Sequence, residues 1–338
     1  MSQSFDLEQA HASQQHPFEK LTPDFVLDAV ESFGYVSDGR MLTLNSYENR
    51  VYQIGIEDKE PIIAKFYRPN RWSTIQILEE HQFCDELVEH ELPVVAPIKI
   101  DGQSLFHYQG FDIAFFKRRG GYAPELDNLD NLFTMGRFLG RIHAIGKAKS
   151  YQCRPTLDVD GFGRDSVDYI IEHAVPMELK TAYQTLAEDV LGQIYSIWND
   201  YGAVETIRTH GDCHPGNILW RDDNPHFVDF DDSRMAPAVQ DIWMLLSGDR
   251  SSQLSQLSEI IDGYQEFCDF NSRELRLVEC LRTLRMLHHS AWIAQRWQDP
   301  AFPQAFPWFN SMNYWEQQIL DLRVQFAELQ EPALTLSF

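Results

Sequence analysis

Cysteine, cationic side chains and long apolar runs are all scarce in this sequence. The five cysteines (Cys84, Cys153, Cys213, Cys268 and Cys280) are scattered and form no C-x-x-C pair, a pattern typical of free thiols in a reducing compartment. Residues 1–20 are polar and contain no apolar stretch of the kind that a secretion signal requires. No part of the chain approaches the roughly 18 uninterrupted apolar residues of a membrane span. These absences argue against a disulfide scaffold and predict a cytoplasmic protein.

The shortage of positive charge restricts the partners of the protein. Lysine and arginine number 28 against 51 aspartate and glutamate, so the formal net charge is −23. A surface of this sign repels phosphate backbones and anionic lipids, so we expect neither nucleic acid nor a membrane as a partner. With 338 residues, 43% of them apolar, the chain is long enough to bury the core of a two-lobed enzyme. We expect it to be a monomer.

The first third of the chain has the period of β-strands. Four strands are predicted, at residues 51–56, 62–67, 104–108 and 111–116. The polar residues 57–60 predict a hairpin connection between the first two. One helix, roughly from Ser73 to Glu91, interrupts this sheet. Ser73 and Gln76 form the signature of a capping box at its start, and Pro93 follows its end.

After residue 118 the apolar period becomes helical. Four sets of residues each share one helical face: Leu132, Met135, Leu139 and Ile142; Leu179, Tyr183, Leu186, Val190, Ile194 and Ile197; Leu277, Leu281, Leu284 and Leu287; and Trp315, Ile319, Leu322, Phe326 and Leu329. A β-rich part that leads into a helical part predicts an α+β fold with two lobes. We predict a polar segment at 1–20, a small β-rich lobe at 21–118 and a larger helical lobe at 119–338, with a hinge near 117–121.

The strongest functional signal is the segment His210-Gly-Asp-Cys-His-Pro-Gly-Asn217, which has the form H-x-D-x-x-x-x-N. It is followed by a turn at 222–225 and by an apolar run that ends at Asp229. This pattern predicts the hairpin on which kinases bring two metal ligands together. Phosphoryl transfer is catalysed mainly by positioning and charge neutralisation, so it requires few protein groups. Asp212 is predicted to accept or orient the proton of the attacking hydroxyl. Asn217 and Asp229 are predicted to supply the oxygen ligands of Mg²⁺. The structural alternative is a turn with Asx capping before a strand.

Six segments give the chain a resemblance to a known family: residues 44–50 (LNSYENR), 65–69 (KFYRP), 77–83 (ILEEHQF), 210–214 (HGDCH), 241–246 (DIWMLL) and 297–303 (WQDPAFP). Over nearly its whole length the sequence resembles the aminoglycoside phosphotransferase and choline kinase superfamily of kinase-like folds. Within this superfamily it is similar to the bacterial stress response kinase A family. The resemblance implies that ATP and Mg²⁺ are cofactors and that serine and threonine hydroxyls of proteins are acceptors. It also implies Asp212 as proton acceptor, Asn217 and Asp229 as magnesium ligands, and Ser46 beside the ATP phosphates.

The sequence departs from the better-known protein kinases at two places. No G-x-G-x-x-G loop precedes the strand that carries Lys65. Residues 45–49 take its place, with backbone N–H groups and the Ser46 hydroxyl as candidate phosphate contacts. Asp229-Phe-Asp231 stands where those kinases have D-F-G. Asp231 is therefore either a second metal or substrate contact, or a solvated carboxylate after a strand.

Lys65 and Glu80 are predicted to form an ion pair in the ATP-binding site. Lys65 alternates with the apolar residues of its strand, so it is either an exposed lysine or an ATP-site residue that needs a carboxylate partner. On the following helix, Glu80 shares a face with apolar residues (Ile77, Cys84 and Leu87), where an acid is costly unless it is paired. Glu79 has more polar neighbours. The helical phase therefore favours Glu80 as the partner of Lys65.

Other polar residues near the motif have structural interpretations. His143 is interpreted as a hydrogen-bonded core residue, and His210 as a residue that shapes the catalytic loop through backbone contacts. Asp241 begins a predicted helix after Pro237, where a carboxylate caps backbone N–H groups, and the resemblance to related kinases implies that it braces this loop as structural support. Cys213 is interpreted as an inert small residue, with redox sensitivity as the alternative.

Three functions are consistent with the sequence. A serine/threonine protein kinase is the leading hypothesis, and for it the acidic net charge predicts acceptor sites flanked by lysine or arginine. A small-molecule kinase for choline, another amino alcohol or an aminoglycoside is the second, because aromatic residues of the second lobe could cage an ammonium group. A nucleotide-binding pseudokinase scaffold is the third. The intact set of Lys65, Asp212, Asn217 and Asp229 argues against it.

Overall fold

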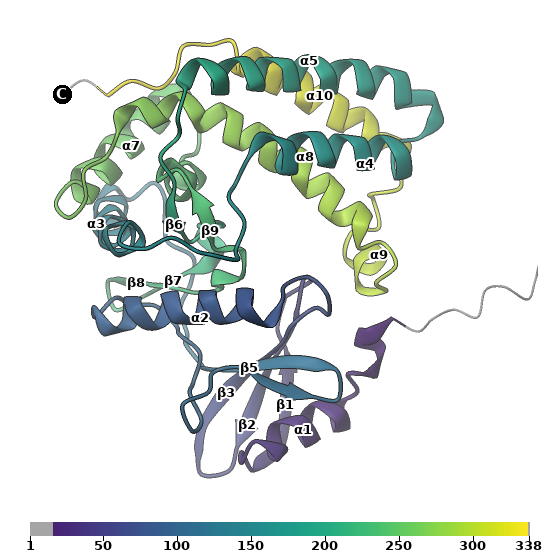
Figure 1. The fold of residues 1–338 in the computed structure, drawn as a ribbon, viewed down its shortest axis with the longest axis vertical. Coiled ribbons are helices and arrows are strands. Elements are labelled where there is room, and N and C mark those ends of the chain that lie inside the picture. The colour runs from purple at the N-terminus through teal and green to yellow at the C-terminus, as the bar shows by residue number, and fades with distance from the viewer. Residues whose placement is uncertain (1–15, 337–338) are drawn as a thin grey trace, which may run out of the picture.

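The protein folds into two lobes, as shown by a computed structural model that describes residues 16–336 (Figure 1). The N-terminal lobe contains a five-stranded sheet in the order β1-β2-β3-β5-β4. Its elements are α1 (Pro23–Ser32), β1 (Ser37–Thr43), β2 (Arg50–Ile56), β3 (Lys59–Phe66), α2 (Thr74–Glu89), β4 (Phe106–Tyr108) and β5 (Phe111–Lys117). The predicted α+β fold, with a small β-rich lobe and a larger helical lobe, is confirmed. Of the predicted polar segment 1–20, residues 1–15 lie outside the described residues, and Phe18 packs into the core of this lobe.

The antiparallel pairing of β2 with β3 follows from the alternation of apolar residues along both strands. One face of the sheet carries Ile54, Ala64 and Phe66, which are buried in the same core as α1. Lys65 leaves the opposite face, as its phase predicted, but it is buried rather than exposed. Strand β1 was not predicted from the sequence. Its residues are mostly exposed, so no apolar period marks it.

Helix α2 lies between the two lobes (Figure 1). It begins at the predicted capping box, in which the Ser73 side chain accepts from the Gln76 N–H and the Gln76 side chain accepts from the Ser73 N–H. The buried Phe83, Cys84 and Leu87 of α2 belong to the core of the second lobe. Although α2 belongs to the N-terminal lobe by sequence, its packing therefore joins that lobe to the helical one.

The second lobe is mainly helical. Its helices are α3 (Leu129–Gly146), α4 (Asp165–His173), α5 (Met177–Tyr201), α6 (Val239–Ile242), α7 (Arg250–Tyr264), α8 (Val278–Gln295), α9 (Ala301–Ala305) and α10 (Met312–Glu328). Two short strand pairs, β6 (Ile207–Thr209) with β9 (Arg234–Ala236) and β7 (Ile218–Arg221) with β8 (Asn224–Phe227), lie beside α2 at the interface with the first lobe (Figure 1). Within residues 16–336, no helix is both long enough and apolar enough to span a bilayer.

Two glycines allow α3 and α7 to pack closely. A Cβ atom on Gly136 would lie 2.0 Å from the carbonyl oxygen of Ile260, and one on Gly140 would lie 2.4 Å from that of Tyr264. Real Cβ atoms do not approach a carbonyl so closely, so a larger residue at either position would push the helices apart. The close packing brings His143 of α3 against Tyr264, with 3.0 Å between Nδ1 and the phenol oxygen. His143 is thereby fixed beneath the loop that carries the H-x-D motif.

Candidate active site

The loop at residues 210–217 is held by a buried carboxylate. Asp241, which is fully buried, accepts hydrogen bonds from the backbone N–H groups of His210 at 2.7 Å and Gly211 at 2.8 Å. Its third partner is His143 Nε2 at 2.9 Å. Burial by itself raises the pKa of Asp241, but the bond to His143 and the charges around it outweigh burial and lower the pKa below its ordinary value. The interpretation of Asp241 as a brace and of His143 as a hydrogen-bonded core residue is confirmed.

His210 shapes the same loop from within. Its Nε2 lies 2.9 Å from the carbonyl oxygen of Val228, and its Nδ1 accepts from the Asp212 N–H at 3.3 Å. Gly211 has a φ of +85°, and a Cβ atom there would lie 2.1 Å from the carbonyl oxygen of Asp232. Only glycine satisfies both requirements. The H-G-D sequence is therefore what allows the loop to lie against residues 228–232.

Asp212 lies at the open side of this loop. Its backbone carbonyl accepts from Nδ2 of Asn217 at 3.0 Å. One carboxylate oxygen, Oδ1, is bound by the guanidinium of Arg285 from α8. The other, Oδ2, lies 3.5 Å from both Asn217 Nδ2 and His214 Nε2. Asp212 therefore has one oxygen in an ion pair and one with only weak contacts.

Asn217 and Asp229 lie on neighbouring ends of the β7–β8 hairpin. The backbone N–H of Val228 donates to the carbonyl of Asn217 at 3.0 Å, which places Asp229 one residue beyond this pair. Because Asn217 donates its Nδ2 to Asp212, its Oδ1 is free to bind a cation. Asp229 has a left-handed backbone with φ of +60°, and its side chain is 50% exposed. An amide oxygen and an accessible carboxylate fit a Mg²⁺ ion that completes its shell with phosphate and water.

Lys65 reaches this pair from the first lobe, but its partner is not Glu80. The Lys65 ammonium lies 2.9 Å from Asp229 Oδ1 and 3.1 Å from Asp231 Oδ1. Burial alone lowers the pKa of Lys65, yet the two carboxylates outweigh burial and hold the pKa well above its ordinary value. Glu80 instead pairs with Arg154, at 3.1 Å between Oε2 and Nη2. The predicted Lys65–Glu80 ion pair is thus wrong.

Glu80 is buried on the inner face of α2, as its helical phase predicted. Glu80 is only 2% exposed, so it needs a buried cation, and Arg154 supplies one from the loop that follows α3. Glu79 faces outward and accepts backbone N–H groups of Cys153 and Arg154 at 3.0 and 2.8 Å. The guanidinium of Arg154 also donates to the carbonyl oxygens of Asp231 and Ser233. Arg154 therefore ties α2 to the segment after Asp229.

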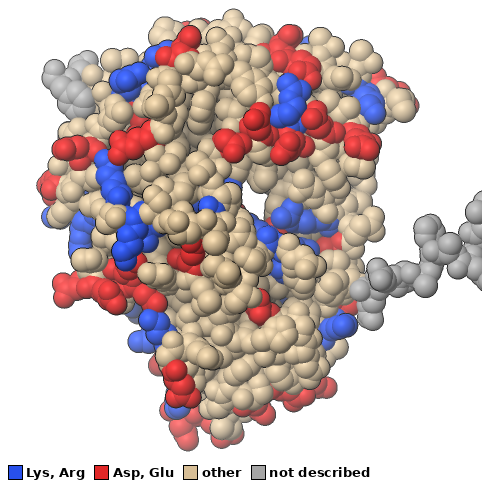
Figure 2. All heavy atoms as spheres, viewed as in Figure 1, with Lys and Arg blue, Asp and Glu red and all other residues tan. Residues whose placement is uncertain are grey.

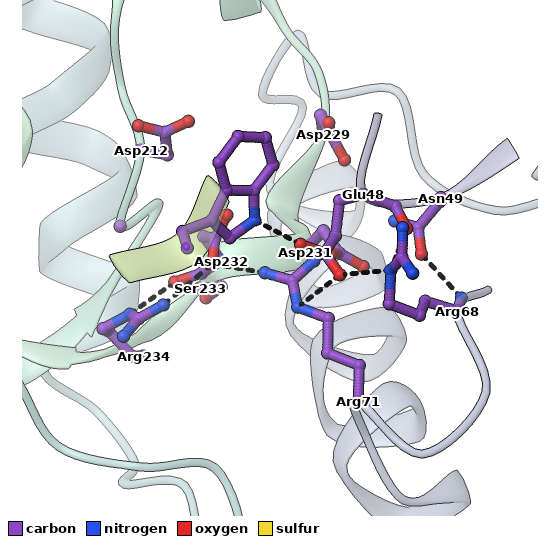
Figure 3. Close-up of polar contacts among 12 residues, drawn as sticks. Glu48, Asn49, Arg68, Arg71, Asp212, Asp229, Asp231, Asp232, Ser233 and Arg234 are labelled. Carbon is purple, nitrogen blue, oxygen red and sulfur yellow. Dashed lines mark hydrogen bonds and ion pairs between the residues drawn. The ribbon is translucent and has the colours of Figure 1, made fainter. Parts of the chain in front are cut away.

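Asp231 is neither a solvated carboxylate nor free to bind a second metal. It is 3% exposed and pairs with both Lys65 and Arg71. Arg71 also binds Asp232 at 2.7 Å, and Figure 3 shows its guanidinium between Glu48, Asp231 and Asp232. Burial raises the pKa of Asp231, but Arg71 and Lys65 outweigh it and lower the pKa to about 2. Asp231 is thus held as an anion by two cations.

The loop that replaces the glycine-rich loop is attached to the second lobe by ion pairs. Ser46 lies in this loop, partly exposed. Two residues further on, Glu48 binds Arg296 at 2.6 Å and the indole N–H of Trp292. A second connection is Asp299, which is 1% exposed and binds Arg50 at 2.7 Å and Arg68 at 2.6 Å. We call these two connections, Glu48–Arg296/Trp292 and Asp299–Arg50/Arg68, the interlobe latch.

The latch gives a structural role to three of the segments that carry the family resemblance. Glu48 and Arg50 lie in 44–50, Arg68 lies in 65–69, and Asp299 lies in 297–303, and these distant segments meet in one place. The sequence contained this signal, because two acids and two arginines within these segments need partners of opposite charge. Arg154 and Arg285 were missed because no local pattern marks either of them.

Cys213 follows Asp212 but points away from solvent. It is fully buried, and burial raises the pKa of its thiol well above the ordinary value. The thiolate that oxidants attack is therefore disfavoured. This supports the interpretation of Cys213 as an inert small residue.

Comparison with known proteins places the chain among phosphotransferases. The phosphotransferase enzyme family matches residues 42–278. Stress response kinase A of Escherichia coli (strain K12) is 44% identical over 328 residues, which cover 95% of this chain and 97% of that protein. Serine/threonine protein kinase RdoA of Salmonella typhimurium is 43% identical over 321 residues and is covered to the same extents.

Solved structures show the same fold at much lower identity. Amicoumacin kinase hAmiN superposes with a TM-score of 0.73 at 17% identity, covering 93% of this chain and 95% of that one. A microcompartment-associated aminopropanol kinase superposes with a TM-score of 0.69 at 16% identity, covering 91% of this chain and 97% of that one. At such identities the likeness concerns the fold alone. The identity to the bacterial relatives over 95% of the chain shows that the protein belongs to the phosphotransferase enzyme family and, within it, to the stress response kinase A family.

Proposed function

We propose that this kinase transfers the γ-phosphate of Mg²⁺-ATP to serine or threonine hydroxyls of proteins. One arrangement carries the proposal: Asp212, Asn217 and Asp229 lie on one loop and hairpin, and Lys65 of the other lobe lies 2.9 Å from Asp229. A base, two oxygen ligands and a cation at the junction of two lobes are the parts that phosphoryl transfer requires.

Each residue has a separate task in the proposed reaction. Bound Mg²⁺-ATP supplies the γ-phosphoryl group and neutralises its developing charge. The acceptor hydroxyl forms the new bond to phosphorus while ADP leaves, and Asp212 takes or orients the hydroxyl proton. Asn217 and Asp229 hold the metal. Lys65 places a positive charge beside Asp229, where it can bind the phosphates of the nucleotide.

The two remaining predicted nucleotide residues act from the first lobe. Ser46 and the backbone of its loop contact the phosphates in the proposed complex. Glu80 does not reach the nucleotide pocket directly in this arrangement. It supports the pocket through Arg154, which donates to the carbonyl of Asp231 at 3.1 Å.

Similar proteins support both the protein acceptor and the use of a nucleotide with a divalent cation. One relative that is 43% identical is named a serine/threonine protein kinase, which supports a protein acceptor. The solved structure of amicoumacin kinase contains AMP-PNP and Ca²⁺, which supports a nucleotide and a divalent cation in this fold.

A small-molecule kinase is the second candidate, because the solved structures with this fold include an aminopropanol kinase. The aromatic residues that suggested an ammonium cage do not favour it. Trp292 packs on Phe302 with ring centroids 4.8 Å apart, and Trp308 packs on Tyr314 at 4.9 Å. Trp292 is thus used in packing and in its bond to Glu48, whereas Trp308 is 43% exposed and packs against the start of α10.

The proposal is tested by incubating the purified protein with γ-labelled Mg²⁺-ATP and with casein or myelin basic protein. We expect label on the protein itself or on the added protein, and acid hydrolysis should release phosphoserine or phosphothreonine. The proposal is falsified if no phosphoamino acid forms while choline, ethanolamine or an aminoglycoside accelerates ADP release. An absence of any ATP turnover would support the scaffold hypothesis instead.

We also propose that the protein works in the cytoplasm as a monomer. ATP is used there, and the five cysteines, all described, are free thiols. Size-exclusion chromatography with light scattering, together with cell fractionation, tests this.

A further inference from the structure

The side chain that lies against Asp212 comes from α8 and is not part of any predicted motif. The guanidinium of Arg285 binds Asp212 Oδ1, and the Arg285 side chain is 42% exposed while that of Asp212 is 21% exposed. Among residues 16–336, this ion pair is the one hydrogen-bonded contact of the guanidinium. A cation with free donors therefore lies exposed beside the carboxylate that must meet the acceptor hydroxyl.

The other cations of the cleft already have partners of their own. Arg71 pairs with Asp231 and Asp232, Arg154 with Glu80, Arg234 with Asp232, and Arg296 with Glu48. Their side chains are 16% exposed or less. Arg71 and Arg154 would each have to leave a carboxylate that is at most 4% exposed in order to bind an acceptor, which is costly. Arg285 would leave Asp212, which is 21% exposed and so loses less when it is unpaired, and the Arg285 side chain itself is 42% exposed.

The histidine next to the Asp212 carboxylate makes a weaker contact than Arg285 does. His214 Nε2 lies 3.5 Å from Asp212 Oδ2, whereas the Arg285 guanidinium forms a hydrogen-bonded ion pair with Oδ1. Between the lobes an opening passes through the molecule, and Lys and Arg atoms lie at its rim (Figure 2). In the described part of the chain, Arg285 is thus the accessible cation nearest to Asp212.

We propose that Arg285 selects acceptors that carry a carboxylate or phosphate next to the reacting hydroxyl. This inference rests on the proposed function and assigns its acceptor class: in a protein, a serine or threonine flanked by acidic residues. When such an acceptor binds, its anionic group takes over the Arg285 guanidinium, and Asp212 Oδ1 becomes free for the hydroxyl. A lysine-flanked or amine acceptor would instead place a second cation beside the guanidinium.

This inference reverses the acceptor charge expected from the sequence. The expectation of lysine- or arginine-flanked sites came from the net charge of −23, which acts from a distance and is screened within about 8 Å at physiological ionic strength. The charge of Arg285 acts by direct contact at the reacting group. Net charge governs how fast a partner arrives, whereas the contact governs which hydroxyl is held in place.

The test compares three serine peptides of equal length, in which the residues next to serine are aspartate, asparagine or lysine. For the wild-type kinase we expect kcat/KM to be roughly 10- to 100-fold higher for the aspartate peptide than for the lysine peptide, the ratio that one hydrogen bond to a charged group supplies. Arg285→Gln should remove this preference, mainly by raising KM for the aspartate peptide. Arg285→Glu should reverse it.

A matched control lies one turn earlier on the same helix. Arg282 binds Glu279 at 3.1 Å and does not contact Asp212, so Arg282→Gln should keep the preference for the aspartate peptide. Affinity for Mg²⁺-ATP, measured by calorimetry, should be the same in all four proteins. The inference is overturned if Arg285→Gln lowers kcat equally for every peptide, because the guanidinium would then serve the transferred phosphoryl group. A wild-type preference for the lysine peptide would also overturn it.

Two small acceptors separate this inference from the proposed function. If the wild-type kinase labels no peptide but phosphorylates D-glycerate rather than choline, and Arg285→Gln abolishes this, the protein acceptor is wrong and the role of Arg285 stands. If choline is phosphorylated in preference to D-glycerate, both are wrong. If the peptides are labelled without regard to their charge, only the role of Arg285 is wrong.

Discussion

The loop at 210–217, which carries the proposed base, and the loop at 44–49 are held in different ways. Buried hydrogen bonds to the backbone hold the first: Asp241 binds two successive N–H groups at 2.7 and 2.8 Å. Charged side chains hold the second: Glu48 binds Arg296 of the other lobe at 2.6 Å. The first loop is therefore rigid because its own backbone is fixed, and the second is fixed only as long as the two lobes keep their positions.

This difference predicts where substitutions stop chemistry and where they weaken nucleotide handling. Hydrogen bonds inside a buried site cannot be replaced by water, so their loss affects stability and geometry together. The ion pairs between the lobes join two separately folded parts, so their loss leaves the backbone of each lobe in place. Substitutions in the two loops test this contrast directly.

The largest effect is expected at the catalytic loop, for Asp212→Asn. The variant should keep its affinity for ATP while kcat falls by roughly 10²–10⁴, the usual contribution of a positioned base. Steady-state kinetics and calorimetry with Mg²⁺-ATP measure the two quantities. Turnover at the wild-type rate would contradict the role of Asp212.

A loss of stability is expected when the brace of the same loop is removed. Asp241→Ala leaves two backbone N–H groups and His143 without their acceptor in a fully buried place. The free energy of unfolding should fall by roughly 3–5 kcal/mol, as for other broken buried pairs. Urea denaturation measures it, with Asp262→Ala on the exposed side of α7 as the matched control. Equal stability of the two variants would show that the loop is not held by Asp241.

A smaller effect is expected at the interlobe latch. Glu48→Gln removes the charge that binds Arg296, so the ATP loop should hold the phosphates less firmly. KM for ATP should rise about three- to tenfold with little change in kcat, the pattern of lost uniform binding. Glu60→Gln, in the exposed start of β3, is the control. A fall in kcat at unchanged KM would place Glu48 in the chemical step.

The smallest effect is expected in the pH dependence of stability, and it comes from Glu274, a buried residue that packs near this loop. Glu274 accepts the Val239 N–H at 2.9 Å, and burial raises its pKa to about 7. A raised pKa means that its contribution to stability is complete below the unfolded value of about 4.5 and is lost as pH rises through about 7. Glu274→Gln keeps the acceptor without the charge. We expect it to melt at a higher temperature than the wild type at pH 8 and at a similar temperature at pH 5.

The same contrast explains how much of the molecule could be predicted from its sequence. The capping box of α2 and the hairpin of β2 and β3 depend on neighbours within a motif or on a regular period, and each was predicted. The bracing role of Asp241 joins residues 30 and 31 positions apart and was predicted only from the resemblance to related kinases. The Lys65–Glu80 pair failed because helical phase shows that an acid is buried but not which cation reaches it. Arg154 is 74 residues away from Glu80, and only the folded chain brings the two together.

The interlobe latch changes the way in which the lobes can move. Two lobes that are joined by a single flexible link can rotate relative to each other about three axes. Here the covalent link near 117–121 is on one side of the cleft, and Glu48–Arg296 together with Asp299–Arg50/Arg68 forms a second attachment on the other. The packing of α2 against the helical lobe attaches the lobes between these two points as well, so no rotation of one lobe leaves every attachment unstrained. The lobes should therefore separate only when the ion pairs of the latch break, and entry of the proposed nucleotide would depend on that step.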